Sequence, residues 1–385
     1  MQSPVLPPQP ARAAPGSRLP GLDHLRALAI VLVVVFHCGL FGHPHWVGTV
    51  GAFGWSGVDL FFVLSGYLIG GPLLGRLAAG RPLALREFYV KRLLRIVPAY
   101  LAVLLLYFTI PAFKERGQLP PLWRFLSFTQ NFGLDLRSGS AFSNAWSLCV
   151  EEQFYLLLPP LLLALALLRP GRYAALLLPA LFGLGLFLRF YSWMLFVEPL
   201  ARANDPGLWQ PYFEWIYYPS YTRMDGLLCG VGLAALQRLR PALWARLAAY
   251  GNAWLLAGLG LLAGAAWLCR ELVDFDAAVF GFPLIAVAYG CLVLAALSPA
   301  CVLSRRGSRL SAFLAAISYS LYLVHKPLIH LTQVLLSGYG WAADGNAVFL
   351  CGLLAALLGG WLLHVLVEQP GLRLRQRLLR RGPGG

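Results

Sequence analysis

Long apolar stretches with few internal charges recur along this chain, and they constrain its fold more than any other feature. About 20 apolar residues in an α-helix cross the hydrocarbon core of a bilayer. Ten stretches come near this length, and we predict a membrane span at about 22–41, 56–75, 93–112, 146–168, 174–196, 218–237, 249–268, 277–297, 311–334 and 346–368. The sequence therefore predicts an all-α integral membrane protein with about ten transmembrane helices.

The composition agrees with a protein that has the lipid bilayer as its solvent. Hydrophobic residues make up 59% of the chain and charged residues 12%, whereas soluble domains carry roughly 25% charged residues. So little polar surface cannot cover a core in water. The net charge of +15 leaves three explanations open: a nucleic-acid partner, an anionic substrate, or the loop bias of a membrane protein.

The positions of the basic residues favour the third explanation. Of the 31 lysines and arginines, 21 fall in segments that would share one side of the membrane, six fall on the other side, and four lie within spans. This asymmetry predicts an even number of spans with both termini in the cytoplasm. Residues 1–20 then form a disordered leader, 21–370 the membrane domain and 371–385 a basic tail, and no nucleic-acid partner is expected.

Seven scattered cysteines without a C-x-x-C pair give no indication of a metal site. We predict no metal and no tightly bound cofactor.

Ionisable residues inside a span are costly and therefore mark candidate functional sites. Arg26 and His37 in the first span are 11 residues apart, which leaves a phase difference of about 20° and an axial separation of about 16 Å. They share one helix face, with Arg26 at the cytoplasmic end and His37 towards the outer side. A snorkelling arginine and a hydrogen-bonded core histidine are the alternative for such a pair.

The topology places six ionisable residues in the outer half of the membrane, namely His37, Asp59, Glu151, Glu152, Asp225 and His325. A carboxylate beside a histidine fixes its tautomer, so we predict that His37 is a general base oriented by Asp59 or Glu152. Each acid alone could equally be a salt-bridge residue. Tyr322, Ser65 or Arg223 would supply the oxyanion donor.

Arginines gather at the cytoplasmic foot of the third span. Arg92 and Arg95 lie at i and i+3, level with Arg26. The positive-inside bias and lipid headgroups explain a single arginine there. Paired guanidinium groups also bind phosphates bidentately, which favours a donor that carries phosphate.

The chain resembles the acyltransferase-3 family of integral-membrane acyltransferases over about 21–370. The resemblance rests on Arg26-x10-His37 followed in order by the motifs GVDLFFVLSGYLIG, RLLR with VPAY, WSLCVEEQFYLLLP, RMDGLLCG and SYSLYLVHKPL.

The resemblance implies a multi-pass protein of the bacterial inner membrane that takes acetyl-CoA, or another acyl-CoA, from the cytoplasm as co-substrate. It implies acyl transfer to a hydroxyl of a carbohydrate or glycoconjugate on the outer side. By this resemblance His37 is catalytic, Arg26, Arg92 and Arg95 bind the donor, and Glu151 or Glu152 supports the centre. Further supporting residues would be Ser65, Trp146, Ser147, Arg223, Asp225, Tyr322 and His325.

Some members of the family carry a periplasmic hydrolase-like domain after the membrane unit. Here the sequence ends in a basic segment, so any second transfer step would need a periplasmic partner protein.

Two other functions are compatible with parts of the pattern. A proton-coupled transporter could use the histidines and carboxylates as a proton relay, but no repeated halves are evident. A glycosyltransferase would favour acidic residues in a large outer loop, where residues 113–145 contain only Glu115 and Asp135.

Overall fold

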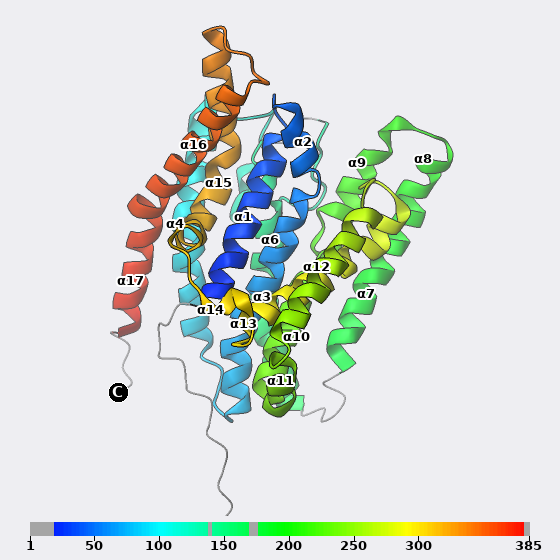
Figure 1. The fold of residues 1–385 in the computed structure, drawn as a ribbon, viewed down its shortest axis with the longest axis vertical. Helices are drawn as coiled ribbons and strands as arrows, with labels where there is room; N and C mark the ends of the chain where they lie inside the picture. Colours follow the sequence, from blue (N-terminus) through cyan, green and yellow to red (C-terminus); the bar gives the residue numbers. More distant parts are fainter. Residues whose placement is uncertain (1–18, 138–140, 169–175, 381–385) are drawn as a thin grey trace, which may run out of the picture.

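The computed structural model describes residues 19–137, 141–168 and 176–380, and in this part of the chain it contains helices and no β-strand (Figure 1). The ten main helices are α1 (Pro20–Cys38), α3 (Gly57–Ala78), α4 (Leu85–Thr109), α6 (Trp146–Leu168), α7 (Leu177–Ser192), α10 (Asp225–Leu239), α12 (Gly251–Leu268), α13 (Phe282–Leu297), α15 (Arg309–Gly338) and α16 (Asn346–Leu363). The others are α2 (His45–Gly51), α5 (Leu122–Leu126), α8 (Glu198–Arg202), α9 (Trp209–Tyr212), α11 (Pro241–Ala248), α14 (Val302–Arg305) and α17 (Gln369–Arg380).

Single turns of other helix types extend or connect these elements. The 3₁₀ turns are η1 (Gly54–Ser56), η2 (Pro111–Phe113), η3 (Ser143–Ala145), η6 (Pro206–Leu208) and η8 (Ser220–Thr222). The π turns are η5 (Trp193–Val197), η7 (Phe213–Tyr217), η9 (Ala277–Gly281) and η10 (His364–Glu368).

Nine helices among the described residues are long and apolar enough to cross a bilayer, in agreement with the all-α membrane fold expected from the sequence. Each corresponds to one predicted span. The remaining predicted span, 218–237, is present as α10, which has 15 residues and is therefore about 22 Å long.

The late start of α10 has a local cause. Pro219 has no N–H to donate to a preceding turn, and its ψ of 140° is extended. The chain between Tyr218 and Asp225 therefore leaves the α-helical path, and the carbonyl of Thr222 is free to accept a hydrogen bond from Arg189 (2.7 Å). The predicted start of this span at 218 was wrong by seven residues.

The C-terminal region is more helical than expected. Residues 371–380 of the predicted tail belong to α17, which continues from α16 through η10 and packs against α4. Most of the predicted leader, 1–18, and the tail residues 381–385 lie outside the described residues.

The helices form a central group and a peripheral group. The central helices α3, α13 and α15 are mostly buried, whereas α7, α12 and α16 expose most of their surface. On α16 the exposed side chains include Leu350, Leu354 and Leu358 at i, i+4 and i+8. An apolar stripe on an outer face is what a lipid-facing helix requires.

The closest crossing joins α3 to α10. A Cβ atom at Gly66 would overlap the Leu227 carbonyl, and a Cβ atom at Gly230 would overlap the Val63 carbonyl. Small residues let backbones approach closely where hydrocarbon tails offer no hydrophobic driving force. This crossing holds α3, which carries several of the site residues, in a fixed position.

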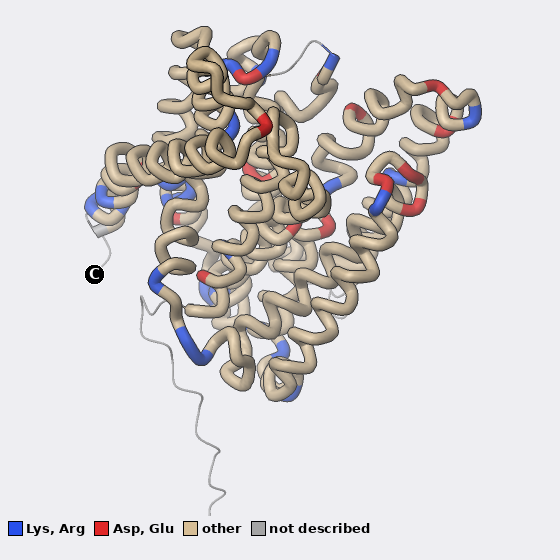
Figure 2. The backbone as a smooth tube through the Cα atoms, turned by 45° about the horizontal axis from the view of Figure 1, so that its top comes forward, with Lys and Arg blue, Asp and Glu red and all other residues tan. Residues whose placement is uncertain are grey.

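Charges are unevenly placed on the bundle. Figure 2 shows basic segments with few acidic neighbours along the lower left and bottom of the molecule, and others beside acidic segments at its upper and right-hand edges. In Figure 1 the start of α1 and the end of α17 both point towards this lower side.

Candidate active site

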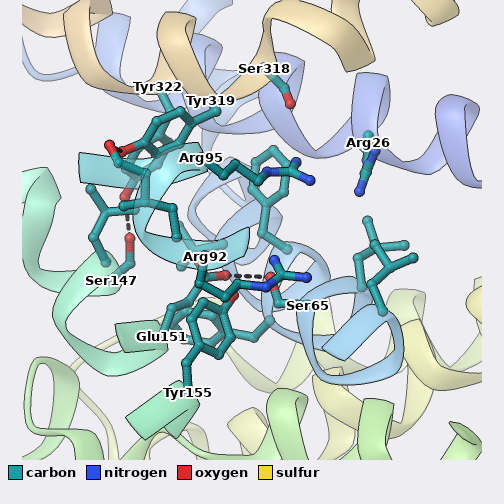
Figure 3. Close-up of a pocket in the computed structure, with 17 residues that line it drawn as sticks. Arg26, Ser65, Arg92, Arg95, Ser147, Glu151, Tyr155, Ser318, Tyr319 and Tyr322 are labelled. Atoms are coloured by element: carbon teal, nitrogen blue, oxygen red, sulfur yellow. Dashed lines mark hydrogen bonds between the residues drawn. The ribbon is translucent and has the colours of Figure 1, made fainter. Parts of the chain in front are cut away.

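A cavity of about 220 Å³ lies between α1, α3, α4, α6 and α15 (Figure 3). Its inner part is lined by Arg26 of α1 with Arg92 and Arg95 of α4, and all three side chains are half-buried. The helical spacing of Arg92 and Arg95 puts them on one face of α4. The structure thus brings together the three arginines that the sequence predicted to act together.

None of these three guanidinium groups forms a hydrogen bond or ion pair with another side chain or carbonyl in the described part of the chain. Arg92 only stacks over the ring of Tyr155, at 5.5 Å from the ring centroid. A half-buried arginine without a carboxylate leaves positive charge uncompensated. The inner part of the cavity is therefore suited to an anion with several oxygen atoms.

Glu151 and Glu152, the two adjacent acids on α6, differ in their position relative to the cavity. Glu151 lines the cavity and accepts a hydrogen bond from Ser65 of α3 at 2.7 Å, which Figure 3 shows between the two helices. Glu152 is not among the lining residues, and its buried Oε1 atom has no hydrogen-bond partner in the described chain. Of the two carboxylates, Glu151 is the one placed to contact a ligand.

Hydroxyl groups form the opposite end of the cavity. Tyr322 of α15 donates to the Asn144 carbonyl at 2.7 Å, so its oxygen accepts from Ser147 of α6 at 2.6 Å. Tyr322 and Ser147 both line the cavity. The ring of Tyr322 lies 5.8 Å from the ring of His325, one helical turn further along α15.

His37, in the last turn of α1, lies beyond this layer and makes a direct contact with His325. Its Nδ1 atom is 3.0 Å from Nε2 of His325 and 2.9 Å from the Val33 carbonyl. His325 is fully buried, and its own Nδ1 atom is 3.1 Å from the Leu321 carbonyl.

These contacts assign the tautomers of both rings. A carbonyl can only accept, so Nδ1 of His325 carries its proton and Nε2 is an acceptor. Nδ1 of His37 then carries the proton that faces both Nε2 of His325 and the Val33 carbonyl. The remaining nitrogen of His37, Nε2, keeps its lone pair and can accept a proton.

A family model described as an acyltransferase domain matches residues 19–365, which is most of the chain. The chain belongs to this acyltransferase family. It is similar to peptidoglycan O-acetyltransferase OatA of Listeria monocytogenes, with 30% identity over 341 residues that cover 83% of this chain and 50% of the relative. YrhL of Bacillus subtilis, provisionally named a peptidoglycan O-acetyltransferase, is 30% identical over 337 residues, or 82% of this chain and 49% of the relative.

An O-acetyltransferase of Staphylococcus aureus, also provisionally named, is 27% identical over 231 residues that cover 57% of this chain and 35% of the relative. The chain spans about half the length of the first two relatives. No solved structure matches it. Nine helices of the described residues are long and apolar enough to cross a membrane, and with these similarities they make the chain a multi-pass membrane acyltransferase with O-acetyltransferase relatives.

The acyltransferase does not place a carboxylate against His37, contrary to the prediction. Both oxygens of Asp59 accept from Nη2 of Arg223, at 2.9 and 3.1 Å. The hydrogen bonds of His37 within the described chain go to Val33 and His325. The expectation that Asp59 or Glu152 orients His37 is therefore wrong, because depth in the membrane does not fix the direction in which a side chain points.

The prediction that Arg223 supplies the oxyanion donor is also wrong, because its guanidinium group is buried and donates to Asp59. Its side chain is fully buried, with the guanidinium carbon 3.9 Å from the Phe282 ring centroid and 5.1 Å from that of Trp146. Cation–π contact of this kind stabilises a desolvated arginine. Asp225 likewise pairs with buried Arg189, at 2.5 and 3.1 Å. Asp59, Arg223, Asp225 and Trp146 thus belong to the structural support of the helices.

Replacing Asp59 with alanine is expected to lower the free energy of unfolding by about 3–5 kcal/mol, because it leaves the Arg223 charge buried without its partner. Chemical denaturation in detergent micelles measures this. Arg202→Ala is the matched control, because it breaks the Arg202–Glu198 pair at its 74% exposed arginine and leaves the hydrogen bond from Trp193 to Glu198 in place, and we expect no measurable change. Equal, small effects in both variants would contradict a structural role for the buried pair.

One polar cluster next to the histidines was not predicted. Lys326, adjacent to His325, is 2.9 Å from both Glu115 and the Ser143 hydroxyl, and the Phe142 amide donates to Glu115 at 3.1 Å. Burial disfavours the charge on Glu115, but the Lys326 ammonium holds the pKa of this carboxyl below its ordinary value. A lysine inside a predicted span was the available signal, and it required a partner that the sequence did not identify.

Proposed function

We propose that this acyltransferase moves an acetyl or related acyl group from cytoplasmic acyl-CoA to a hydroxyl of a carbohydrate or glycoconjugate at the outer face of the bacterial inner membrane. One observation carries this proposal. A single cavity has at one end three arginines that are unpaired within the described residues, and at the other end hydroxyl groups beside the His37–His325 pair.

The orientation of the donor site follows from the charges. Basic residues predominate in the segments at the foot of α4 and the start of α1, and such segments remain in the cytoplasm. We count α10 as a tenth crossing beside the nine long helices of the described residues, which would make the number of crossings even. Arg26, Arg92 and Arg95 then face the cytoplasmic pool of acyl-CoA, whereas His37 lies about 16 Å further out along α1.

The arginines would bind the phosphates of acyl-CoA, since planar guanidinium groups match phosphate oxygens bidentately. The acyl-pantetheine arm would extend past Ser65 and Glu151 towards Ser147 and Tyr322. Tyr322 separates the cavity from the histidines, so its side chain would move when the thioester reaches His37. Of the three predicted oxyanion donors, Tyr322 is the one whose ring lies beside His325. Its hydroxyl would have to leave the Asn144 carbonyl to donate to the oxyanion, whereas Ser65 donates to Glu151 and Arg223 to Asp59.

The chemical step would be direct transfer with His37 as general base. The acceptor hydroxyl gives its proton to Nε2 of His37 while its oxygen attacks the thioester carbonyl carbon. The C–S bond breaks as the ester C–O bond forms, and the departing CoA thiolate takes the proton back from His37. His325 acts through His37 by fixing its tautomer, so it is a positioning residue.

Replacing His325 with alanine is expected to lower kcat roughly 10²-fold, because the Nδ1 proton of His37 loses one of its two acceptors and the ring loses the side chain that orients it. The KM for acyl-CoA should stay unchanged, since His325 does not line the cavity. His325→Gln, whose amide oxygen can accept the same hydrogen bond, should retain more activity. Steady-state kinetics of the purified protein in liposomes measures both parameters.

His330→Ala is the control for that experiment. His330 lies on the same helix and contacts Phe41 instead of His37, with ring centroids 5.7 Å apart. It should leave kcat unchanged. A loss in kcat that is the same for His330→Ala and His325→Ala would argue against a specific effect on His37.

The proposed activity can be tested with purified protein in liposomes, radiolabelled acetyl-CoA and candidate glycans. The names of the relatives make cell-wall glycan fragments the first acceptors to try. We expect acyl ester to form on the glycan. Proton-coupled solute flux without any acyl transfer would contradict the proposal and favour a transporter.

A further inference from the structure

A second cavity, of about 240 Å³, lies between the inner halves of α3 and α4. Leu68 and Arg92 line both this cavity and the first one. The two spaces are therefore neighbours that share a wall, and the second begins where the arginines of the first are located. From Leu68 to Arg76 the second cavity follows α3 for eight residues, or about 12 Å.

The second cavity is basic. Arg76, Lys91 and Arg92 contribute three positive charges, and Glu87 contributes one negative charge, which pairs with Lys91. Arg76 donates from Nε to the Pro82 carbonyl at 2.7 Å. Its terminal nitrogen atoms form no hydrogen bond or ion pair in the described chain, so they remain free for an anion.

The other walls are suited to a flat, partly polar group. Leu73 and Phe88 give apolar and aromatic surface. Pro72 lies inside α3 and has no N–H, so the Leu68 carbonyl lacks the donor that residue i+4 normally supplies. Leu68 lines both cavities, so this carbonyl is a candidate acceptor for a ligand at their junction.

We propose that the second cavity binds the phosphorylated nucleoside end of acyl-CoA, with Arg76 on the ribose phosphate. This proposal rests on the proposed function, since it places the remainder of the same donor. The diphosphate lies at Arg92, the residue shared by both cavities, and the pantetheine arm enters the first cavity. The protein then distinguishes a CoA thioester from a pantetheine thioester that lacks the nucleotide.

Bilayer phosphates are the other source of anions for these side chains. Arg76 and Arg92 favour the soluble donor because they line a recess that borders the donor cavity, rather than an open face of the bundle. The two sources can be distinguished by removing phosphate groups from the donor. This should weaken donor binding if Arg76 and Arg92 hold the donor, and should have no effect if they hold lipid headgroups.

The test compares three donors with wild-type protein in liposomes: acetyl-CoA, acetyl-dephospho-CoA without the ribose 3′-phosphate, and S-acetyl-phosphopantetheine without the nucleoside. We expect KM to rise about tenfold or more at each truncation. Equal KM values for all three donors would overturn the nucleotide site and leave the proposed function intact. Absence of transfer from every donor would instead refute the proposed function.

The Arg76→Ala variant tests whether Arg76 is the residue that recognises the ribose phosphate. We expect this variant to raise the KM for acetyl-CoA about tenfold and to leave the KM for S-acetyl-phosphopantetheine unchanged, with Arg76→Lys in between. Arg81→Ala, an exposed arginine in the turn after α3 that does not line the cavity, is the control and should alter neither value. An equal change for all donors in Arg76→Ala would assign Arg76 to lipid contact or folding.

Discussion

Replacing His37 with alanine is expected to reduce acyl transfer by about 10²–10⁴-fold, the range that a positioned general base contributes. The reason is local: Nε2 of His37 is the one ring nitrogen of the His37–His325 pair whose lone pair accepts no hydrogen bond within the described chain. Donor binding should persist, because His37 does not line the arginine cavity. The measurement is the rate of ester formation at saturating acetyl-CoA, with donor affinity determined separately.

Two variants control for loss of fold. His37→Gln keeps a hydrogen-bonding side chain at the end of α1 but cannot act as a base at neutral pH, so it should be as inactive as His37→Ala. His45→Ala removes an exposed histidine of the nearby helix α2 and should be fully active. Undiminished transfer in His37→Ala would exclude His37 as the base.

The double replacement of Arg92 and Arg95 with alanine is expected to weaken acyl-CoA binding by about 10²-fold or more. Hydrogen bonds to charged groups contribute about 1.5–3 kcal/mol each, which is roughly tenfold to a hundredfold per arginine. Since neither side chain has a carboxylate partner within the described chain, no ion pair is lost with them. Equilibrium binding of radiolabelled acetyl-CoA to the detergent-purified variant measures the effect.

Arg86→Ala separates donor binding from membrane insertion. Arg86 lies near the start of α4 on the same side, is exposed and lines neither of the two cavities. It should bind acetyl-CoA like the wild type. An insertion or topology defect in the double variant, at unchanged affinity, would defeat the assignment of Arg92 and Arg95 to the donor.

Features that depend on a single helix could be predicted from the sequence. The phase of Arg26 and His37 along α1, and the shared face of Arg92 and Arg95 on α4, follow from helical periodicity alone. The structure contains both helices, α1 over Pro20–Cys38 and α4 over Leu85–Thr109. It also places the three arginines in one cavity.

Contacts between helices were less predictable. Topology gave the depth of Asp59, Glu152 and His325 but not their direction around the helix axis, so a carboxylate was expected where His325 lies. The sequence also did not identify the ion pair between Lys326 and Glu115, because these residues are 211 positions apart in the chain (326 minus 115). The start of α10 was misplaced because hydropathy does not register the break at Pro219.

The central claim is that the donor enters from one side of the membrane and the acyl group is delivered to the other. Liposomes that contain the oriented protein, with radiolabelled acetyl-CoA only on the side of α4's first turn and a glycan acceptor only on the side of His37, test it directly. For the wild type we predict labelled acyl ester on the glycan. His37→Ala should form none, and the Arg92→Ala/Arg95→Ala double variant should form it only at high donor concentration. Transfer that requires donor and acceptor on the same side would contradict it.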